Sequence, residues 1–129
     1  MARDSFIDDP DFRAWERWPW AKRDPANWPV HHLLYRFAQL CYAKRTIEIG
    51  IGRGMGTYVL GTYAKLVGGT HTAIDIAPNT IARAQKIKDA FDLPVEIIHK
   101  DSKTVKWKLW TDLIYVDGGH TKEQVLGDI

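Results

Sequence analysis

Residues 46–56, Thr-Ile-Glu-Ile-Gly-Ile-Gly-Arg-Gly-Met-Gly, decide the fold of this chain of 129 residues. The opening run, Thr-Ile-Glu-Ile, is rich in β-branched side chains and predicts a short buried strand. Glycines then occupy every second position. Alternate glycines let the backbone turn sharply and approach a ligand without a Cβ in the way. The stretch therefore predicts a strand that ends in a bare turn, with a ligand-binding site at that turn.

The sequence around this turn repeats one pattern, in which a short apolar run is followed by a helical one. Apolar positions at three- and four-residue spacing indicate helices, and continuous short apolar runs indicate buried strands. Pro78 suits the first turn of a helix, and Gly68-Gly69 and Leu93-Pro94 mark helix ends. The expected elements are a helix over 29–42, a strand over 46–49, a helix through 59–67, a strand over 72–76, a helix from 78, strands over 95–98 and 113–116, and a helix that begins near Thr121 with a Thr-x-x-Gln capping box.

The alternation of strands and helices predicts the fold class. Short strands separated by helices of about a dozen residues form parallel βαβ units with right-handed crossovers. The expected strands are apolar on both faces, as in a sheet that helices cover on each side. We expect an α/β fold with a doubly wound, mainly parallel, Rossmann-like sheet, formed as one domain by residues 29–129.

Residues 1–28 differ from the rest in composition. Four of the six tryptophans and three of the six prolines lie in this segment. Bulky aromatic residues between prolines suit an irregular segment that is attached to a surface by aromatic anchors. We therefore expect a tryptophan-rich N-terminal arm that precedes the Rossmann-like domain.

The overall composition limits the classes of protein to which the chain could belong. Hydrophobic residues make up 45% of the chain and charged residues 26%, which is typical of a globular protein. Cys41 is the only cysteine, so a disulfide-built secreted scaffold is excluded. No apolar stretch is long enough to span a membrane, and the start of the chain lacks the apolar core of a signal peptide. The net charge of +2 indicates neither a nucleic-acid nor a membrane partner, and we expect a cytoplasmic protein.

Acidic residues stand near the ends of all four predicted strands. Glu48 lies just before the glycines, Asp75 ends the second strand, Asp101-Ser102 follow the third, and Asp117 follows the fourth. In a doubly wound sheet, ligands bind beyond the carboxyl ends of the strands, where the strand order reverses. Acidic residues and glycines at this one edge of the sheet therefore predict the position of the binding site.

The glycine spacing excludes two common ligand-binding loops. A dinucleotide-binding loop requires Gly-x-Gly-x-x-Gly, but counting from Gly50 or Gly52 places Met55 or Thr57 where the third glycine belongs. A P-loop requires a lysine after its last glycine, and no lysine occurs in this loop. The loop therefore suits a ligand other than a dinucleotide or a nucleoside triphosphate.

The spacing Glu48-x-Gly50-x-Gly52-x-Gly54 resembles the first motif of the class I S-adenosylmethionine-dependent methyltransferases. Asp75 resembles the acidic residue with which this family holds the ribose. The resemblance covers roughly residues 30–129 and implies S-adenosylmethionine as the cofactor. The cofactor-binding residues that it implies are Glu48, Gly50, Gly52, Gly54, Thr57, Asp75, Ile76, Asp101 and Ser102.

The resemblance also implies which part of the cofactor each residue contacts. Glu48 and the glycine backbone would hold the methionine end, with Thr57 near its carboxylate at a helix N-terminus. Asp75 offers two acceptor oxygens to the two ribose hydroxyls, and Asp101 and Ser102 would contact the adenine. An anionic rim with backbone N–H donors suits a ligand that combines a sulfonium cation, a diol and a zwitterion.

The segment 112–120, Asp-Leu-Ile-Tyr-Val-Asp-Gly-Gly-His, resembles the fourth-strand region of the small-molecule O-methyltransferases. This resemblance implies methyl transfer to a hydroxyl of a small-molecule acceptor, with Asp117 and His120 as catalytic residues and His120 as the general base. Metal-dependent relatives place a Mg²⁺ ligand at the position of Asp117. Their other ligands come from later strands that this sequence lacks, so we expect no metal site, with Mg²⁺ at Asp117 as the alternative.

The family's sheet has seven strands in the order 3-2-1-4-5-7-6, and this sequence contains the first four, which gives an expected order of 3-2-1-4. We therefore expect the N-terminal part of a catalytic domain that is incomplete at its C-terminus. An uncovered fourth strand would expose a pairing edge, so we expect a homo-oligomer or a missing C-terminal half to cover it. Two other functions stay open, namely a non-catalytic cofactor-binding or assembly module and another nucleotide-using α/β enzyme.

Overall fold

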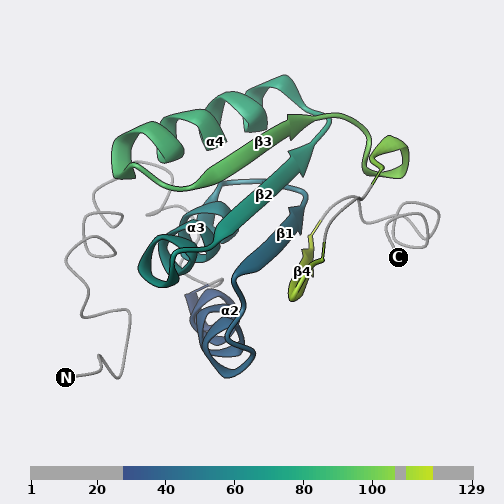
Figure 1. The fold of residues 1–129 in the computed structure, drawn as a ribbon. Coiled ribbons are helices and arrows are strands. Elements are labelled where there is room, and N and C mark those ends of the chain that lie inside the picture. Colours follow the sequence, from purple (N-terminus) through teal and green to yellow (C-terminus); the bar gives the residue numbers. More distant parts are fainter. Residues whose placement is uncertain (1–27, 107–109, 118–129) are drawn as a thin grey trace.

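The computed structural model describes the backbone of residues 28–106 and 110–117, and the side chains of these ranges from Leu33 onward. The expected N-terminal arm, apart from Trp28, and the expected helix near Thr121 lie outside the described residues. Each strand and helix expected within the described ranges is present (Figure 1). The elements are α2 (Trp28–Leu40), β1 (Arg45–Ile49), α3 (Met55–Val67), β2 (Thr70–Asp75), α4 (Pro78–Phe91), β3 (Val95–His99), the short 3-10 helix η4 (Ser102–Thr104) and β4 (Leu113–Val116).

The described strands form one parallel sheet in the order β3-β2-β1-β4. Ile49 at the end of β1 is in register with Ile74 of β2 on one side and Val116 of β4 on the other. The chain moves outward from β1 to β3 and then returns to the opposite side of β1 as β4. This reversal confirms the expected α/β, Rossmann-like sheet and its strand order, and it places the topological switch point between β1 and β4.

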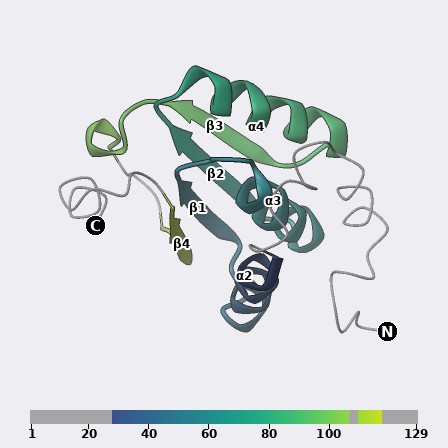
Figure 2. The ribbon, with the colours of Figure 1, turned by 180° about the vertical axis from the view of Figure 1, so that it is seen from behind.

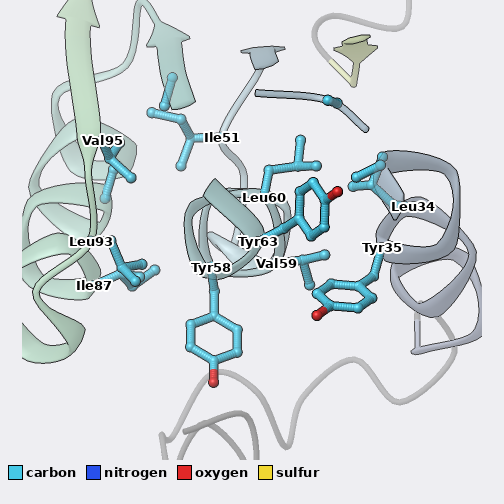
Figure 3. Close-up of a cluster of buried hydrophobic side chains, with 14 residues drawn as sticks. Leu34, Tyr35, Ile51, Tyr58, Val59, Leu60, Tyr63, Ile87, Leu93 and Val95 are labelled. Carbon is cyan, nitrogen blue, oxygen red and sulfur yellow. The ribbon is translucent and has the colours of Figure 1, made fainter. Parts of the chain in front are cut away.

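Helix α3 is the centre of the hydrophobic core. It packs on β1 and β2 with α2 on one side and α4 on the other, and all three helices lie on the same face of the sheet (Figures 1 and 2). Tyr58 and Leu60 of α3 are fully buried, and Tyr63 meets Tyr35 of α2 edge-on with ring centroids 5.5 Å apart. Figure 3 shows the α3 side chains enclosed between residues of α2 and residues of α4 and β3. This packing fixes the N-terminus of α3 directly above the end of β1.

The opposite face of the sheet carries a second, smaller apolar cluster. Ile47, Ile49 and Ile74 form it, with Ile98 and Val105 packed against them. Among the described residues, only the connection between β3 and β4 crosses this face, which we call the open face (Figures 1 and 2). Because the first two crossovers lie on one face and the third on the other, the sheet is doubly wound. Within the described ranges, no helix combines the length and the apolar composition needed to cross a membrane.

Candidate functional site

The predicted binding edge of the sheet is formed by backbone hydrogen bonds between neighbouring strand ends. Gly50 N–H donates to Ile74 O of β2, and Asp117 N–H donates to Ile49 O of β1, both at 2.8 Å. The glycine loop after β1 therefore starts beside the end of β2, and Asp117 leaves β4 beside the end of β1. This is the switch point at which open α/β sheets bind their ligands.

The glycine loop has a backbone that L side chains rarely adopt. Gly50, Gly52 and Gly54 have φ values of 91°, 54° and 94°, and Gly54 N–H closes a turn by donating to Ile51 O at 2.9 Å. A Cβ on Gly52 would meet no atom within 4 Å, whereas a Cβ on Gly54 would collide with Ile87 Cδ1 of α4. Gly54 thus lets the loop pack against α4, while Gly52 presents bare backbone to open space.

The Asp75 carboxylate fastens this loop to the end of β2. Its Oδ2 accepts from Ile51 N–H at 2.8 Å, and its Oδ1 accepts from Ile76 N–H at 2.7 Å and Ala77 N–H at 3.1 Å. Burial raises the pKa of Asp75, but these three N–H donors and the nearby Thr80 hydroxyl outweigh it and lower the pKa below its usual value. Asp75 is therefore held as a half-buried anion against the glycine loop.

Ile76 provides an apolar surface next to this anion. Its side chain is 65% exposed although it directly follows a buried strand. The Nε2 of His99, at the end of β3, donates to Ile76 O at 2.9 Å and so fixes the backbone at this position. An exposed isoleucine beside a carboxylate and a bare loop is suited to a ligand that has both a flat apolar part and hydroxyl groups.

Glu48 and Thr57 lie beneath the loop rather than on its surface, which differs from the expected direct contact with the ligand. Both side chains are buried, and the Thr57 hydroxyl donates to Glu48 Oε1 at 2.5 Å. The carboxylate also lies against Gly56, where a Cβ would collide with Glu48 Oε2. The physical reason is the strand pleat, which turns Glu48 toward α3, so that these two side chains support the loop from below.

Sequence reasoning missed His71 and Thr46, which complete this buried cluster. His71 Nε2 lies 3.2 Å from Glu48 Oε1, and its Nδ1 lies 2.7 Å from Thr46 Oγ1. His71 is fully buried and pairs in register with Thr46. A histidine within an otherwise buried strand next to the glycine-loop strand is the signal that could have found it, because buried polar groups need partners.

Sequence reasoning also missed Arg83 of α4, which contacts the glycine loop. Its guanidinium donates to Gly52 O at 2.6 Å, and its side-chain carbons lie 3.8 Å from the position of a Cβ on Gly54. The hydrogen bond is exposed, so its contribution to stability is small. Arg83 nevertheless helps to fix the direction in which the Gly52 carbonyl points.

The predicted adenine-contacting residues follow β3. Asp101 is exposed, and its Oδ1 accepts from Lys103 N–H at 3.0 Å, so this carboxylate caps η4, which starts at Ser102. Only one of the two carboxylate oxygens of Asp101 takes part in this cap. The structure thus places Asp101 and Ser102 at the same sheet edge as Asp75.

Asp117 is the one predicted catalytic residue within the described ranges, and His120 lies outside them. The Tyr115 hydroxyl donates to Asp117 Oδ2 at 3.3 Å. Burial raises the pKa of Tyr115, and the charges of Asp117 and Glu48 raise it further, so that the phenol keeps its proton. In the described part of the chain, no group of three or more His, Cys, Asp or Glu side chains could hold a metal ion.

Comparison of the sequence with models of protein families shows to which family the chain belongs. A family model described as a methyltransferase domain matches residues 47–129, from within β1 to the last residue. The chain belongs to this methyltransferase family. The family expected from the glycine motif is thereby confirmed, and the match includes the loop, Asp75 and the segment after β4. No curated protein sequence matches the chain significantly.

Solved structures of methyltransferases resemble the chain at low sequence identity. PaMTH1 of Podospora anserina, solved with SAH, is 20% identical, with a TM-score of 0.66 over 86% of this chain and 50% of that one. The O-methyltransferase of Bacillus cereus, also solved with SAH, is 20% identical, with a TM-score of 0.60 over 92% and 56%. TomG of Streptomyces achromogenes, an O-methyltransferase solved with SAM, is 20% identical, with a TM-score of 0.58 over 69% and 43%.

These similarities establish the fold, which is the Rossmann-like fold of the family. The chain spans about half the length of each of these three solved structures.

Proposed function

We propose that the chain forms the cofactor-binding part of an S-adenosylmethionine-dependent methyltransferase that acts on a hydroxyl of a small molecule. The observation that carries the proposal is the bond from Ile51 N–H to Asp75 Oδ2 at 2.8 Å. This bond holds a carboxylate, the exposed Ile76 and the bare backbone at Gly52 next to one another at the carboxyl ends of β1 and β2, beside the switch point. Family membership supports the proposal independently.

The residues of this edge fit S-adenosylmethionine, which when bound supplies an electrophilic methyl group on its sulfonium. Gly52 faces open space, so the methionine part of the ligand would lie against the loop backbone without meeting a side chain. Ile76 would pack on the adenine ring. Each carboxylate oxygen of Asp75 can accept about two hydrogen bonds, and Oδ2 accepts only one backbone N–H, so it would receive a ribose hydroxyl.

The remaining predicted cofactor residues take different roles in this proposal. Asp101 would approach the adenine through its uncapped oxygen and Ser102 through its hydroxyl. Glu48 and Thr57 would act from beneath the loop, because their side chains bond to each other. The methionine carboxylate would then face the N-terminal N–H groups of α3, where the helix dipole favours an anion.

Two of the similar solved structures are named O-methyltransferases, and this supports a hydroxyl group as the methyl acceptor. Much of the rate of methyl transfer can come from holding the acceptor atom in line with the methyl group. His120 would remove the acceptor proton, and Asp117 would orient the acceptor at the end of β4. A Mg²⁺ ion at Asp117 is the alternative means of lowering the acceptor pKa.

The direct test is calorimetric binding of SAH to the chain and to two matched variants. Ile76→Ala removes exposed apolar surface that the adenine would cover, and we expect about tenfold weaker binding, since a few buried methylenes contribute about 1–2 kcal/mol. Leu40→Ala is the control, because Leu40 is 76% exposed on α2. Its affinity should equal that of the wild type. Equal affinity of all three proteins would contradict the proposed site.

Transfer of a labelled methyl group to a panel of small hydroxylated acceptors tests the activity itself. Binding of SAH without transfer to any acceptor would favour a non-catalytic module. Thermal stabilisation by NAD but not by S-adenosylmethionine would favour another nucleotide-using enzyme.

We infer that the β4 edge and the open face are covered in the functional protein. Ile114 and Val116 of β4 expose 54% and 41% of their surface there. A second copy of the chain or segments equivalent to the other half of the longer relatives would cover them. The cytoplasmic location expected from the sequence stays a prediction.

A further inference from the structure

His71 is a fully buried ionisable residue to which the proposed function gives no role. We propose that His71 is a positioning residue that fixes the carboxylate of Glu48 and, through Glu48, the glycine loop and the first turn of α3. It does so from beneath the site, without touching a ligand. The inference rests on the proposed function, because its first consequence is a change in cofactor affinity.

The contacts form one continuous chain of side chains. Thr46 Oγ1 lies 2.7 Å from His71 Nδ1, His71 Nε2 lies 3.2 Å from Glu48 Oε1, and the Thr57 hydroxyl donates to the same oxygen at 2.5 Å. No member exposes more than 2% of its surface. The chain therefore runs from β1 through β2 and back to β1, and it ends on α3.

The hydrogens of this chain can be assigned from the chemistry of its members. Glu48 Oε1 accepts, so Nε2 of His71 must carry the hydrogen that points to it. In the tautomer that carries its hydrogen on Nε2, the ring accepts on Nδ1 from the Thr46 hydroxyl. Every contact in the chain then joins one donor to one acceptor, which is the arrangement that buried polar groups require.

Glu48 depends on these donors because it has lost its contact with water. A buried carboxylate is costly unless it is hydrogen-bonded, and removal of one partner leaves the other uncompensated. Thr57 and His71 are the side-chain donors to Oε1 among the described contacts. Without the Nε2–H, Glu48 would have to turn toward another donor or toward solvent.

A movement of Glu48 would be transmitted to the loop because no space separates them. A Cβ on Gly56 would collide with Glu48 Oε2 and would lie 3.1 Å from Tyr115 Cε1. The first turn of α3 therefore lies directly on the carboxylate, and Gly54, its N-cap residue, is the last glycine of the loop. The orientation of the carboxylate thus sets the position of the backbone N–H groups that would face the cofactor.

The test compares SAH affinity in the wild type, His71→Gln, His71→Leu and Leu93→Ala. Gln can place an N–H near the Nε2 position, so His71→Gln should bind within about threefold of the wild type, whereas His71→Leu should bind about tenfold or more weakly. Leu93 is a buried core residue just after the C-terminal end of α4. Leu93→Ala should lower the stability of the protein without changing the affinity. Loss of affinity in parallel with stability in all variants would overturn the inference.

Two measurements on the ligand-free protein separate this inference from the proposed function. Ring ¹⁵N chemical shifts should show His71 protonated on Nε2, and amide exchange at residues 50–57 should accelerate in His71→Leu but not in Leu93→Ala. If the wild type fails to bind SAH, the proposed function is wrong, and these measurements still decide whether His71 holds the loop. If His71→Leu does not fold, His71→Asn replaces it, since Asn reaches Thr46 but not Glu48.

Discussion

At the residue scale, two glycines of the loop have different physical reasons for lacking a side chain. Gly54 combines a φ of 94° with close packing against Ile87, so both its conformation and its space exclude a Cβ. Gly52 has a φ of 54° but open space around it. Packing and backbone conformation therefore both explain Gly54, whereas at Gly52 the left-handed conformation alone favours glycine and the space around it stays open to the proposed ligand.

Substitution by alanine should separate these two reasons. Gly54→Ala should lower the free energy of unfolding by about 2–3 kcal/mol, because overpacking and left-handed strain add. Gly52→Ala should lower the free energy of unfolding by only about 1 kcal/mol. It should nevertheless bind SAH about tenfold more weakly, because its methyl group would stand where the ligand would lie. Urea unfolding and calorimetry measure both effects. Unchanged SAH affinity in Gly52→Ala would mean that the ligand does not approach this backbone.

Asp75 should make the stability of the loop depend on pH. Its pKa is lowered in the folded protein, because the hydrogen bonds from Ile51, Ala77 and Ile76 N–H and from Thr80 outweigh the effect of burial. A carboxyl whose folded pKa lies below its unfolded pKa stabilises the protein fully above the unfolded value, and this contribution is lost as the pH falls toward the folded value. The stabilisation should therefore be complete at neutral pH and decline below about pH 4.

The measurement is urea unfolding of the wild type and Asp75→Asn across this range. At neutral pH the variant should be less stable by about 1–2 kcal/mol, since it loses a charged acceptor of backbone hydrogen bonds. The difference should shrink as the carboxyl of the wild type becomes protonated. A difference in stability that stays constant down to pH 3 would contradict the stabilising role of the ionised Asp75 carboxylate.

At the scale of elements, the position of α3 depends on the turn that joins it to β2. Gly68 ends the helix in a left-handed conformation and donates to Ala64 O. Gly69 follows with its Cα against the backbone of Lys44, and Thr70 N–H donates to Lys44 O at 2.7 Å. The C-terminal end of α3 is therefore fastened to the start of β1, while its N-terminal end lies on Glu48.

The two glycines of this turn should respond differently to alanine. A Cβ on Gly69 would collide with the carbonyl of Lys44, and backbone cannot move aside as a flexible side chain can. Gly69→Ala should therefore cost more than about 2 kcal/mol of unfolding free energy, whereas Gly68→Ala, with open space around it, should cost about 1 kcal/mol. The midpoints of urea unfolding of the two variants measure these losses of unfolding free energy. Equal losses would show that the turn is free to rearrange.

The elements could be predicted from the sequence, but the contacts beneath the loop could not. Strand runs, helix spacing and glycine stops are local signals, and they placed α3, β2 and α4 correctly. The burial of Glu48 and its bond to His71 depend on which face of β1 meets α3, and on a pairing between residues 23 positions apart. Such long-range register is set by tertiary packing, so the sequence located Glu48 at the site but not its direction.

At the scale of the whole molecule, the two faces of the sheet are covered unequally. α2, α3 and α4 bury one face, and the open face keeps Ile47 and Ile49 buried mainly under the connection between β3 and β4. Trp110 of that connection is 84% exposed beside a hollow on this face. Among the described strands, β4 also has a free edge, which is prone to pairing with another chain.

The 129-residue chain by itself should therefore self-associate through β4 and the open face, in a concentration-dependent way that sedimentation velocity can follow. Ile114→Lys places a charge on this exposed surface and should shift the chain toward the monomer, because a charge on an edge strand opposes pairing. Leu40→Lys adds the same charge to exposed α2, on the helix-covered side of the sheet, and should leave the association unchanged. A wild-type chain that stays monomeric at every concentration, or an equal response of the two variants, would mean that this face needs no cover.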